Sequence, residues 1–290
     1  MSLESGHLQT YEYGAESMVL RPWKMLAGMW RDLIDNRQLA RILAVRDLSA
    51  QYRQSLFGLF WILAPPIVVA VGLSVAQQNK ILSFGTSSIP TPAYILIGMC
   101  FWQVFAQAVS GPLQVMGSYR SVLTKVVVPP EAIILSSMVK LGITATLQII
   151  LIFFTFLWFH LPFSSTTLLG IPVMVLTAIF GTGVGLLIMP IGLLYRDVAL
   201  AIPIVEKGWL AVTPVVFAAK TLDPGGFYAT TARLNPMTYL ISTARQLVAG
   251  EHVTMIPQFL CVVAISSVML LIGLVLVRAA MPLVIERWSA

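Results

Sequence analysis

Six apolar stretches, each long enough to cross a lipid bilayer as a helix, constrain this sequence more than any other feature. A bilayer core about 30 Å thick requires about 20 apolar residues of helix, and lipid cannot satisfy the open edge of a strand. The stretches cover residues 59–76, 93–116, 132–159, 168–194, 198–218 and 257–284. They predict an all-α integral membrane protein with six transmembrane helices in a transmembrane domain over residues 59–286.

The composition excludes a water-soluble globular protein. Hydrophobic residues make up 58% of the 290 residues, charged residues only 10%, and the mean hydropathy is +0.86. Soluble proteins carry about 25% charged residues, because a surface in water requires them. The net charge of +6 does not indicate nucleic-acid binding, since the basic residues lie mainly at the ends of the apolar stretches and form no single stripe.

The distribution of lysine and arginine predicts how the chain is oriented. Cytoplasmic segments of membrane proteins are enriched in these residues. The basic residues before the first stretch are Arg21, Lys24, Arg31, Arg37, Arg41, Arg46 and Arg53. With this end in the cytoplasm, the other basic residues also favour the inner side, so both termini are expected to be cytoplasmic. Residues 1–20 form a polar tail without an apolar core, and we expect no cleaved signal peptide.

Residues 21–58 are expected to form a cytoplasmic segment at the membrane surface. Trp23 and Trp30 recur with two leucines at helical spacing, and Lys24 and Arg31 lie between them. This pattern is typical of a basic amphipathic helix in the headgroup layer. A helix that packs against a soluble partner shows the same pattern, and beside a transmembrane stretch the interfacial interpretation is favoured.

A second segment without a full span, residues 220–256, is expected on the outer side. The helix breakers Pro224-Gly225-Gly226 and Asn235-Pro236 flank short apolar runs within it. This alternation predicts short re-entrant helices in the outer leaflet, between the fifth and sixth transmembrane helices.

The sequence contains no recognisable set of catalytic or metal-binding residues. His7, His160 and His252 are far apart, so neither a metal site nor catalysis is expected. Cys100 and Cys261 lie in apolar stretches and are expected to act as small hydrophobic residues. No G-x-x-x-x-G-K-[ST] phosphate loop occurs. We therefore expect that the chain binds no cofactor and that any ATP driving it binds to another polypeptide.

The second apolar stretch carries a polar stripe. Gln103, Gln107, Ser110 and Gln114 recur at intervals of three and four residues, which places them on one helix face. Amides beside aromatic rings suit sugars, which present hydroxyl groups at their edges and C–H bonds on their faces. Hydrogen bonding between helices also explains such a stripe. The pattern alone favours this second explanation and leaves the first one open.

Charged, glycine and proline residues within the other stretches predict local features. Glu206 and Lys207 lie in the first half of the fifth stretch, where a charge faces a wet cavity or a partner, or reaches the headgroups. Gly181 and Gly185 form a G-x-x-x-G spacing that predicts close helix packing. Pro65-Pro66 predicts a kink in the first helix.

Four blocks of sequence, in order along residues 40–285, resemble a known family of membrane proteins. They are Arg46-Asp47-Leu48-Ser49-Ala50-Gln51-Tyr52-Arg53-Gln54-Ser55-Leu56-Phe57-Gly58-Leu59-Phe60-Trp61 followed by Pro65, Leu123-Thr124-Lys125-Val126 with Pro129-Pro130, Leu194-Tyr195-Arg196-Asp197-Val198 followed by Thr213-Pro214-Val215, and Asn235-Pro236-Met237-Thr238-Tyr239-Leu240 with Arg245 and Gly250. The blocks resemble the ABC-2 type permeases, in particular the branch that exports polysaccharides and polyol phosphates. The first forty residues lie outside the resemblance, and Glu206 and Lys207 stand where the family usually has apolar residues.

The resemblance implies a function in export. Two copies of the chain would form a channel in the bacterial cytoplasmic membrane, above two copies of a separate subunit that binds ATP and Mg²⁺. The substrate would be a lipid-linked glycan, such as O-antigen, capsular polysaccharide or teichoic acid. The chain itself would be a transport subunit and not an enzyme. An ABC-2 exporter of a small molecule or lipid, and an ATP-independent secondary transporter, are the alternatives.

The resemblance and the residue patterns together select candidate functional residues. Contact with the ATP-binding subunit is expected from Tyr119, Arg120, Leu123, Thr124, Lys125, Arg196 and Asp197. The channel and the substrate contacts are expected at Phe60, Trp61, Trp102, Gln103, Phe105, Gln107, Glu206 and Trp209. The membrane-surface helix is expected to act through Trp23, Lys24, Trp30 and Arg31.

Overall fold

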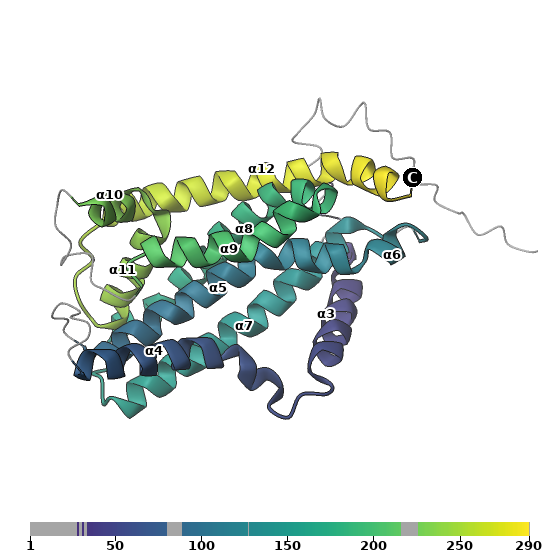
Figure 1. Ribbon diagram of the computed structural model, residues 1–290. Helices are drawn as coiled ribbons and strands as arrows, with labels where there is room; N and C mark the ends of the chain where they lie inside the picture. The colour runs from purple at the N-terminus through teal and green to yellow at the C-terminus, as the bar shows by residue number, and fades with distance from the viewer. Residues whose placement is uncertain are drawn as a thin grey trace, which may run out of the picture.

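The computed structural model describes residue 28, residue 31 and residues 34–79, 89–126, 128–215 and 226–289, and their regular elements are all helical. Four helical segments are long and apolar enough to cross a membrane. They are α5 (Thr91–Ser118), α7 (Pro130–Trp158), η2 (Ser165–Leu169) with α8 (Gly170–Leu194), and α12 (Ile256–Ser289). These segments confirm four of the six predicted stretches, and they lie side by side in Figure 1.

The first and fifth predicted stretches form shorter helices. The first is divided into a 3₁₀ helix, η1 (Gly58–Ile62), and α4 (Ala64–Gln78). Pro65-Pro66 lies in the first turn of α4, where a missing backbone N–H costs nothing. The prolines thus follow a junction between two helices, η1 and α4, and do not interrupt one continuous helix. The fifth stretch forms α9 (Arg196–Val212), which ends six residues earlier than predicted because Thr213 turns to extended backbone before Pro214.

Helix α5 lies at the centre of the bundle, between α7 and α8, and α8 in turn packs against α12. Glycines permit the close approach of these helices. A Cβ atom on Gly181 would lie 2.8 Å from the carbonyl oxygen of Phe105 on α5, and one on Gly183 would lie 3.0 Å from the backbone nitrogen of Leu270 on α12. The close packing predicted from the glycine spacing is thus present, and α8 packs closely against α5 on one side and α12 on the other.

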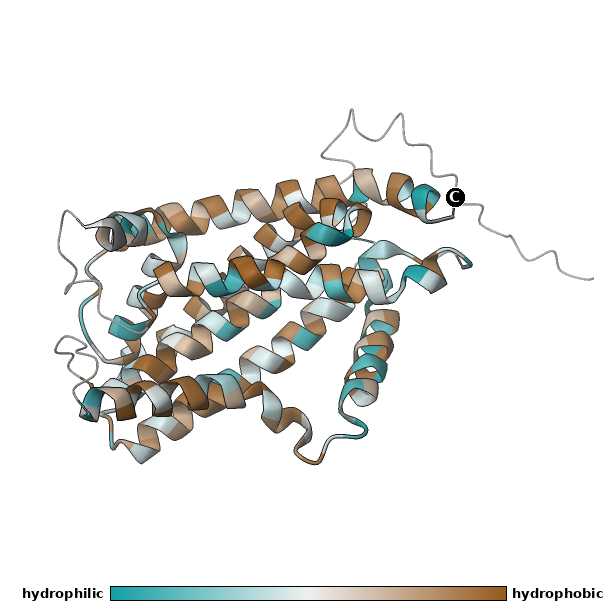
Figure 2. Ribbon diagram, in the orientation of Figure 1, coloured by the Kyte–Doolittle hydropathy of each residue, from teal (hydrophilic) through white to brown (hydrophobic). Residues whose placement is uncertain are grey.

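The two ends of the bundle differ in character. The C-terminal end of α12, the short helix α6 (Arg120–Leu123) and the turn between α8 and α9 gather at one end, whereas α10 (Phe227–Leu234) and α11 (Pro236–Val248) lie at the other (Figure 1). Figure 2 shows hydrophobic residues along α4 and α12 and hydrophilic residues on α3. Short helices between the fifth and sixth stretches are therefore present as α10 and α11, and their re-entrant placement in the outer leaflet stays a prediction.

Helix α3 (Arg37–Tyr52) crosses the others at a steep angle and packs against α7 through Ala40, Leu43 and Ala44. It belongs to the segment predicted to lie at the membrane surface. Of the four residues predicted to act in the membrane-surface helix, only Arg31 is described. It forms an exposed 4.0 Å ion pair with Asp35. Trp23, Lys24 and Trp30 lie outside the described residues.

Candidate functional site

A cavity of about 670 Å³ opens between α3, η1, α5 and α7. Its volume lies within the range of about 300–1,000 Å³ that is usual for small-ligand sites. Helix α3 closes one side with Gln51 and Tyr52, and η1 contributes Trp61. The opposite side consists of the polar face of α5 and of Lys140 and Thr144 on α7. A cavity of this polarity is unexpected within a bundle of such apolar helices.

The polar stripe of α5 follows this cavity along most of its length. Gln103, Gln107 and Gln114 all line the cavity, and none of their amides forms a hydrogen bond with another group in the part of the chain that the structure describes. Ser110 instead faces the neighbouring groove, and its hydroxyl group donates to the carbonyl oxygen of Ala106 at 2.9 Å. The stripe therefore does not hold helices of this chain together, although the sequence pattern alone favours that role.

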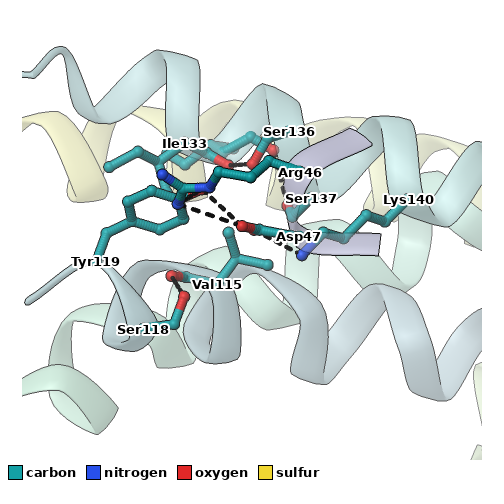
Figure 3. Close-up of polar contacts among 10 residues, drawn as sticks. Arg46, Asp47, Val115, Ser118, Tyr119, Ile133, Ser136, Ser137 and Lys140 are labelled. Carbon is teal, nitrogen blue, oxygen red and sulfur yellow. Dashed lines mark hydrogen bonds and ion pairs between the residues drawn. The ribbon is translucent and has the colours of Figure 1, made fainter. Parts of the chain in front are cut away.

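A charged network closes the end of the cavity where α3 meets α5 and α7 (Figure 3). Asp47 accepts a hydrogen bond from the hydroxyl group of Tyr119 at 2.8 Å and one from Nζ of Lys140 at 2.8 Å. Arg46 donates to the Tyr119 hydroxyl oxygen at 2.7 Å and lies over the ring of Tyr119. Three elements are thereby joined through a single carboxylate.

Burial and hydrogen bonding act in opposite directions on the carboxylate of this network. Burial alone raises the pKa of Asp47, but the hydrogen bonds from Lys140 and Tyr119 and the positive charges of Lys140 and Arg46 outweigh it, so the pKa lies below its usual value. Burial and the adjacent carboxylate raise the pKa of Tyr119 to about 12. At neutral pH the phenol therefore stays protonated, and its O–H group donates a hydrogen bond to Asp47.

The sequence predicts Tyr119 as a contact for another subunit and does not mark Lys140 as a functional residue. A lysine inside an apolar stretch is itself a signal, because a membrane-embedded charge requires a partner. Lys140 lies in the third predicted stretch, and Asp47 lies in the first resembling block. Neither signal indicates that the two residues meet.

The aromatic residues predicted for the channel divide into two groups. The buried Trp102, Phe105 and Phe180 form a cluster with the half-buried Trp209, in which the ring centroids of Phe105 and Trp209 are 5.0 Å apart and those of Trp102 and Phe105 are 5.2 Å apart. None of these three predicted residues lines the cavity. Trp61, by contrast, lines the cavity and is 59% exposed.

Phe60 and Glu206 lie apart from the cavity. Phe60, beside Trp61 on η1, is 71% exposed. Glu206 is half-buried on α9, and one of its carboxylate oxygens has no hydrogen-bond partner within the described chain. Lys207 is exposed.

The residues predicted to contact an ATP-binding subunit gather at the end of the bundle that holds α6. Arg120 and Lys125 are exposed near α6, and Arg196 and Asp197 are exposed at the start of α9. A groove of about 340 Å³ separates the two regions and is lined by Arg120, Arg196 and Trp288. Tyr119 and Leu123 are buried and Thr124 is half-buried, so these three side chains offer less surface to a partner.

A second polar network fixes the opposite end of α9. The Asn235 side chain accepts from Nε1 of Trp209 at 3.0 Å and donates to the Thr213 hydroxyl oxygen at 2.7 Å. Arg245 on α11 is buried; it donates to the carbonyl oxygens of Pro214, at 2.8 Å, and Val215. These contacts join α9 to α11.

The described residues contain no group of three or more His, Cys, Asp or Glu side chains placed to hold a metal ion. His160 and His252 lie in separate connections, between α7 and η2 and between α11 and α12. Cys100 is buried within α5 and Cys261 is exposed on α12. His7 lies outside the described residues.

Sequence comparison relates this chain to a known family of membrane proteins. The profile of the ABC-2 type transporter family matches residues 38–249, from α3 to the end of α11. The O-antigen export system permease protein RfbA of Myxococcus xanthus is 26% identical over 250 residues, which cover 83% of this chain and 91% of that protein. A protein of the same name from Klebsiella pneumoniae is 23% identical over 212 residues, covering 71% of this chain and 78% of the relative. Because the family profile spans most of the sequence, this chain belongs to the ABC-2 type transporter family.

Proposed function

We propose that this chain is the membrane-spanning subunit of an ATP-driven exporter that moves a lipid-linked polysaccharide across the bacterial cytoplasmic membrane. The glycan would be of the O-antigen, capsule or teichoic-acid type. The observation that carries the proposal is the relationship, over 83% of the chain, to a protein named as an O-antigen export permease. The polar cavity beside α5 supports it, because a permease for lipid-linked sugars requires polar surface inside an apolar bundle.

In the proposed topology the chain crosses the membrane six times. Besides the four long segments, η1 with α4 forms the first span and α9 forms the fifth. A helix of 17 residues such as α9 is about 26 Å long, which suffices for a bilayer that thins locally. Both termini and α3 then lie in the cytoplasm, and α10 and α11 enter the outer leaflet.

Two copies of the chain are proposed to form the export path, with α4 and α9 facing each other across it. Only Ile202 of α9 is buried, and Leu200, Ile204 and Val205 are exposed apolar side chains on the same helix. A helix with so little cover within its own chain requires either lipid or a second protein around it. The half-buried Glu206 would then face the path, since a charge is costly against lipid.

ATP and Mg²⁺ are proposed to bind to two copies of a separate subunit at the end of the bundle that holds α6. The exposed Arg196 and Asp197 at the start of α9 would dock into this subunit. Replacement of either residue by alanine is expected to lower glycan export at least tenfold while the complex still hydrolyses ATP. Normal export by both variants, at equal protein levels, would remove these residues from the coupling step.

Loss of the chain in its host tests the proposed function directly. Deletion of its gene is expected to remove the glycan from the cell surface and to leave lipid-linked glycan on the cytoplasmic side, as measured by surface labelling and lipid extraction. Restoration should require both this chain and an active ATPase. Unchanged surface glycan would favour export of a small molecule or lipid, and restoration without any ATPase would favour a secondary transporter.

A further inference from the structure

The cavity between α3, η1, α5 and α7 presents hydrogen-bonding groups that this chain leaves free. Gln103, Gln107 and Gln114 point three primary amides along one wall, and each amide offers two donors and a carbonyl acceptor. From Gln103 to Ser118 the wall runs about 22 Å along α5, at 1.5 Å per residue. A ligand that both donates and accepts hydrogen bonds at many points therefore fits this wall.

The lining carries no free charge. Asp47 and Lys140 are the only charged residues among those that line the cavity, and they pair with each other at 2.8 Å. Phosphate sites usually offer Arg or Lys side chains that are available to the ligand. A phosphate group, or an anionic lipid headgroup, would have to break the existing ion pair in order to bind here.

An acyl chain is also a poor occupant. It would leave the three amides and the hydroxyl groups of Tyr52 and Thr144 without partners, and an unpaired polar group away from water is costly. Sugars combine the two properties that the cavity requires, because their hydroxyl groups both donate and accept while their ring faces are apolar. The indole of Trp61, which is 59% exposed, offers a flat surface for such a face.

We propose that this cavity binds one or two uncharged sugar residues of the exported glycan within each copy of the chain. The site is distinct from the proposed path between two copies, because none of its lining residues belongs to α4 or α9. Helix α3 forms one wall, so the contacts of Asp47 with Tyr119 and Lys140 complete the site. The proposal rests on the proposed function, since it assigns a place in the permease to the same glycan.

Photocrosslinking in the host tests the site. The residue p-benzoylphenylalanine is placed at Gln107 in the cavity or at Gly142 on α7, which is exposed and has open space around it. Ultraviolet light is expected to produce a glycan-bearing adduct at position 107 and none at position 142. The adduct should disappear in cells that lack the first glycosyltransferase of the glycan.

Two results would overturn the proposal, and they are distinguishable. Absence of a glycan adduct at position 107, in a variant that still exports glycan, would refute the sugar site and leave the proposed function intact. Surface glycan that does not depend on the chain at all would refute both. If the variant at position 107 fails to accumulate, the same photoreactive residue at Gln103 provides the measurement.

A binding measurement on the complete transporter provides a second test. The chain and its ATPase are placed in lipid nanodiscs, and ATP hydrolysis is followed against lipid-linked glycan extracted from the host. Gln103→Leu combined with Gln107→Leu is expected to raise the glycan concentration for half-maximal stimulation about tenfold, as loss of two neutral hydrogen bonds predicts. Gly111→Leu, which places an apolar side chain in the cavity beside Gln107, should have at least this effect, since a Cβ there meets only the Gln107 amide, at 3.7 Å.

Matched substitutions outside the cavity serve as controls. Gln258→Leu removes an exposed amide at the start of α12, and Gly142→Leu adds the same side chain to the exposed face of α7. Both are expected to retain the half-maximal concentration of the parent. An unchanged value in the double variant and in Gly111→Leu would overturn the proposal, as would an equal rise in the two controls.

Discussion

Single side chains fix the helix ends in this molecule, and Arg245 is the clearest case. Its guanidinium group is buried, donates to the carbonyl oxygens of Pro214 and Val215, and lies 3.7 Å from the centroid of the Tyr94 ring. Space for it exists only because residue 98 on α5 is glycine. A Cβ atom there would overlap the guanidinium group and lie 3.0 Å from the Val215 carbonyl oxygen.

Gly98→Ala is therefore expected to destabilise the protein by about 2 kcal/mol, because Arg245 must give up charged hydrogen bonds in order to move. The measurement is the apparent Tm of the detergent-solubilised protein. Gly72→Ala on α4 is the control, since no atom lies within 4 Å of the added Cβ. An equal Tm for the two variants would show that Arg245 moves aside without loss.

At the scale of single residues, the sequence indicates which side chains are important better than it indicates which residues they contact. Arg245 and Asn235 both lie in a resembling block, and hydropathy marks neither residue as buried. Their partners at and just after the C-terminal end of α9 lie between 22 and 31 residues away, and the pairing depends on the residue at which α9 ends. The glutamines of α5 show the converse, because their spacing alone predicts a common face and the structure gives that face a cavity.

At the scale of elements, α3 depends on its polar contacts more than the long helices do. Only Ala40, Leu43 and Ala44 of this helix are buried, so the ion pair of Asp47 with Lys140 provides a large share of its attachment. Asp47→Asn removes the negative charge and leaves Lys140, whose side chain is 14% exposed, without an anion.

The expected result of Asp47→Asn is a broader range of positions for α3 relative to α7. Pulsed electron–electron double resonance measures the distribution of distances between spin labels at Arg41→Cys and Gly142→Cys. The labelled chain carries alanine in place of Cys100 and Cys261. Asp35→Asn is the control, because its ion pair with Arg31 is highly exposed and such pairs contribute about 0–1 kcal/mol. A distance distribution unchanged by Asp47→Asn would mean that apolar packing alone holds α3.

The same distance should change when the pH is lowered through the pKa of Asp47. Because the pKa of Asp47 is lowered in the folded protein, its stabilising contribution is complete above the ordinary value of 3.8 and is lost as the pH falls through the lower, folded value. We expect the same distribution at pH 8 and pH 5, and a broader one only below pH 3.8. Broadening between pH 8 and pH 5 would assign the attachment to another group.

The existence of the long helices could be predicted from hydropathy, and their ends could not. The predicted range 93–116 became Thr91–Ser118, whereas 198–218 became Arg196–Val212. Apolar residues continue past Val212, but Thr213 adopts extended backbone before Pro214 and the helix stops. The first apolar stretch forms a 3₁₀ helix, η1, followed by an α-helix, α4. Hydropathy does not distinguish these two kinds of helix.

At the scale of the whole molecule, the exposed apolar faces of α4 and α9 require a neighbour. Val68 on α4 is 67% exposed and Ile204 on α9 is 72% exposed. If α4 of one copy faces α9 of the other, cysteines at both positions, in a chain whose Cys100 and Cys261 are replaced by alanine, should yield mostly linked dimers with a bifunctional thiol crosslinker in membranes. Phe154 on α7, which is 59% exposed, is the control position and should remain monomeric. Dimers at Phe154 alone would place the contact between copies elsewhere.

The glycines of α8 divide the molecule into a part that can move and a part that cannot. A Cβ atom added at Gly181 would meet the Phe105 carbonyl oxygen and the Ala108 side chain of α5, and one added at Gly183 would meet backbone atoms of α12. Sliding of these helices would bring backbone atoms into overlap, so the three act as a stationary frame. A force at Arg196 would then move α9 more easily than this frame, because only Ile202 of α9 is buried, whereas α3 packs on α7, outside the frame. In a transport cycle, α9 would then turn against a stationary unit formed by α5, α8 and α12.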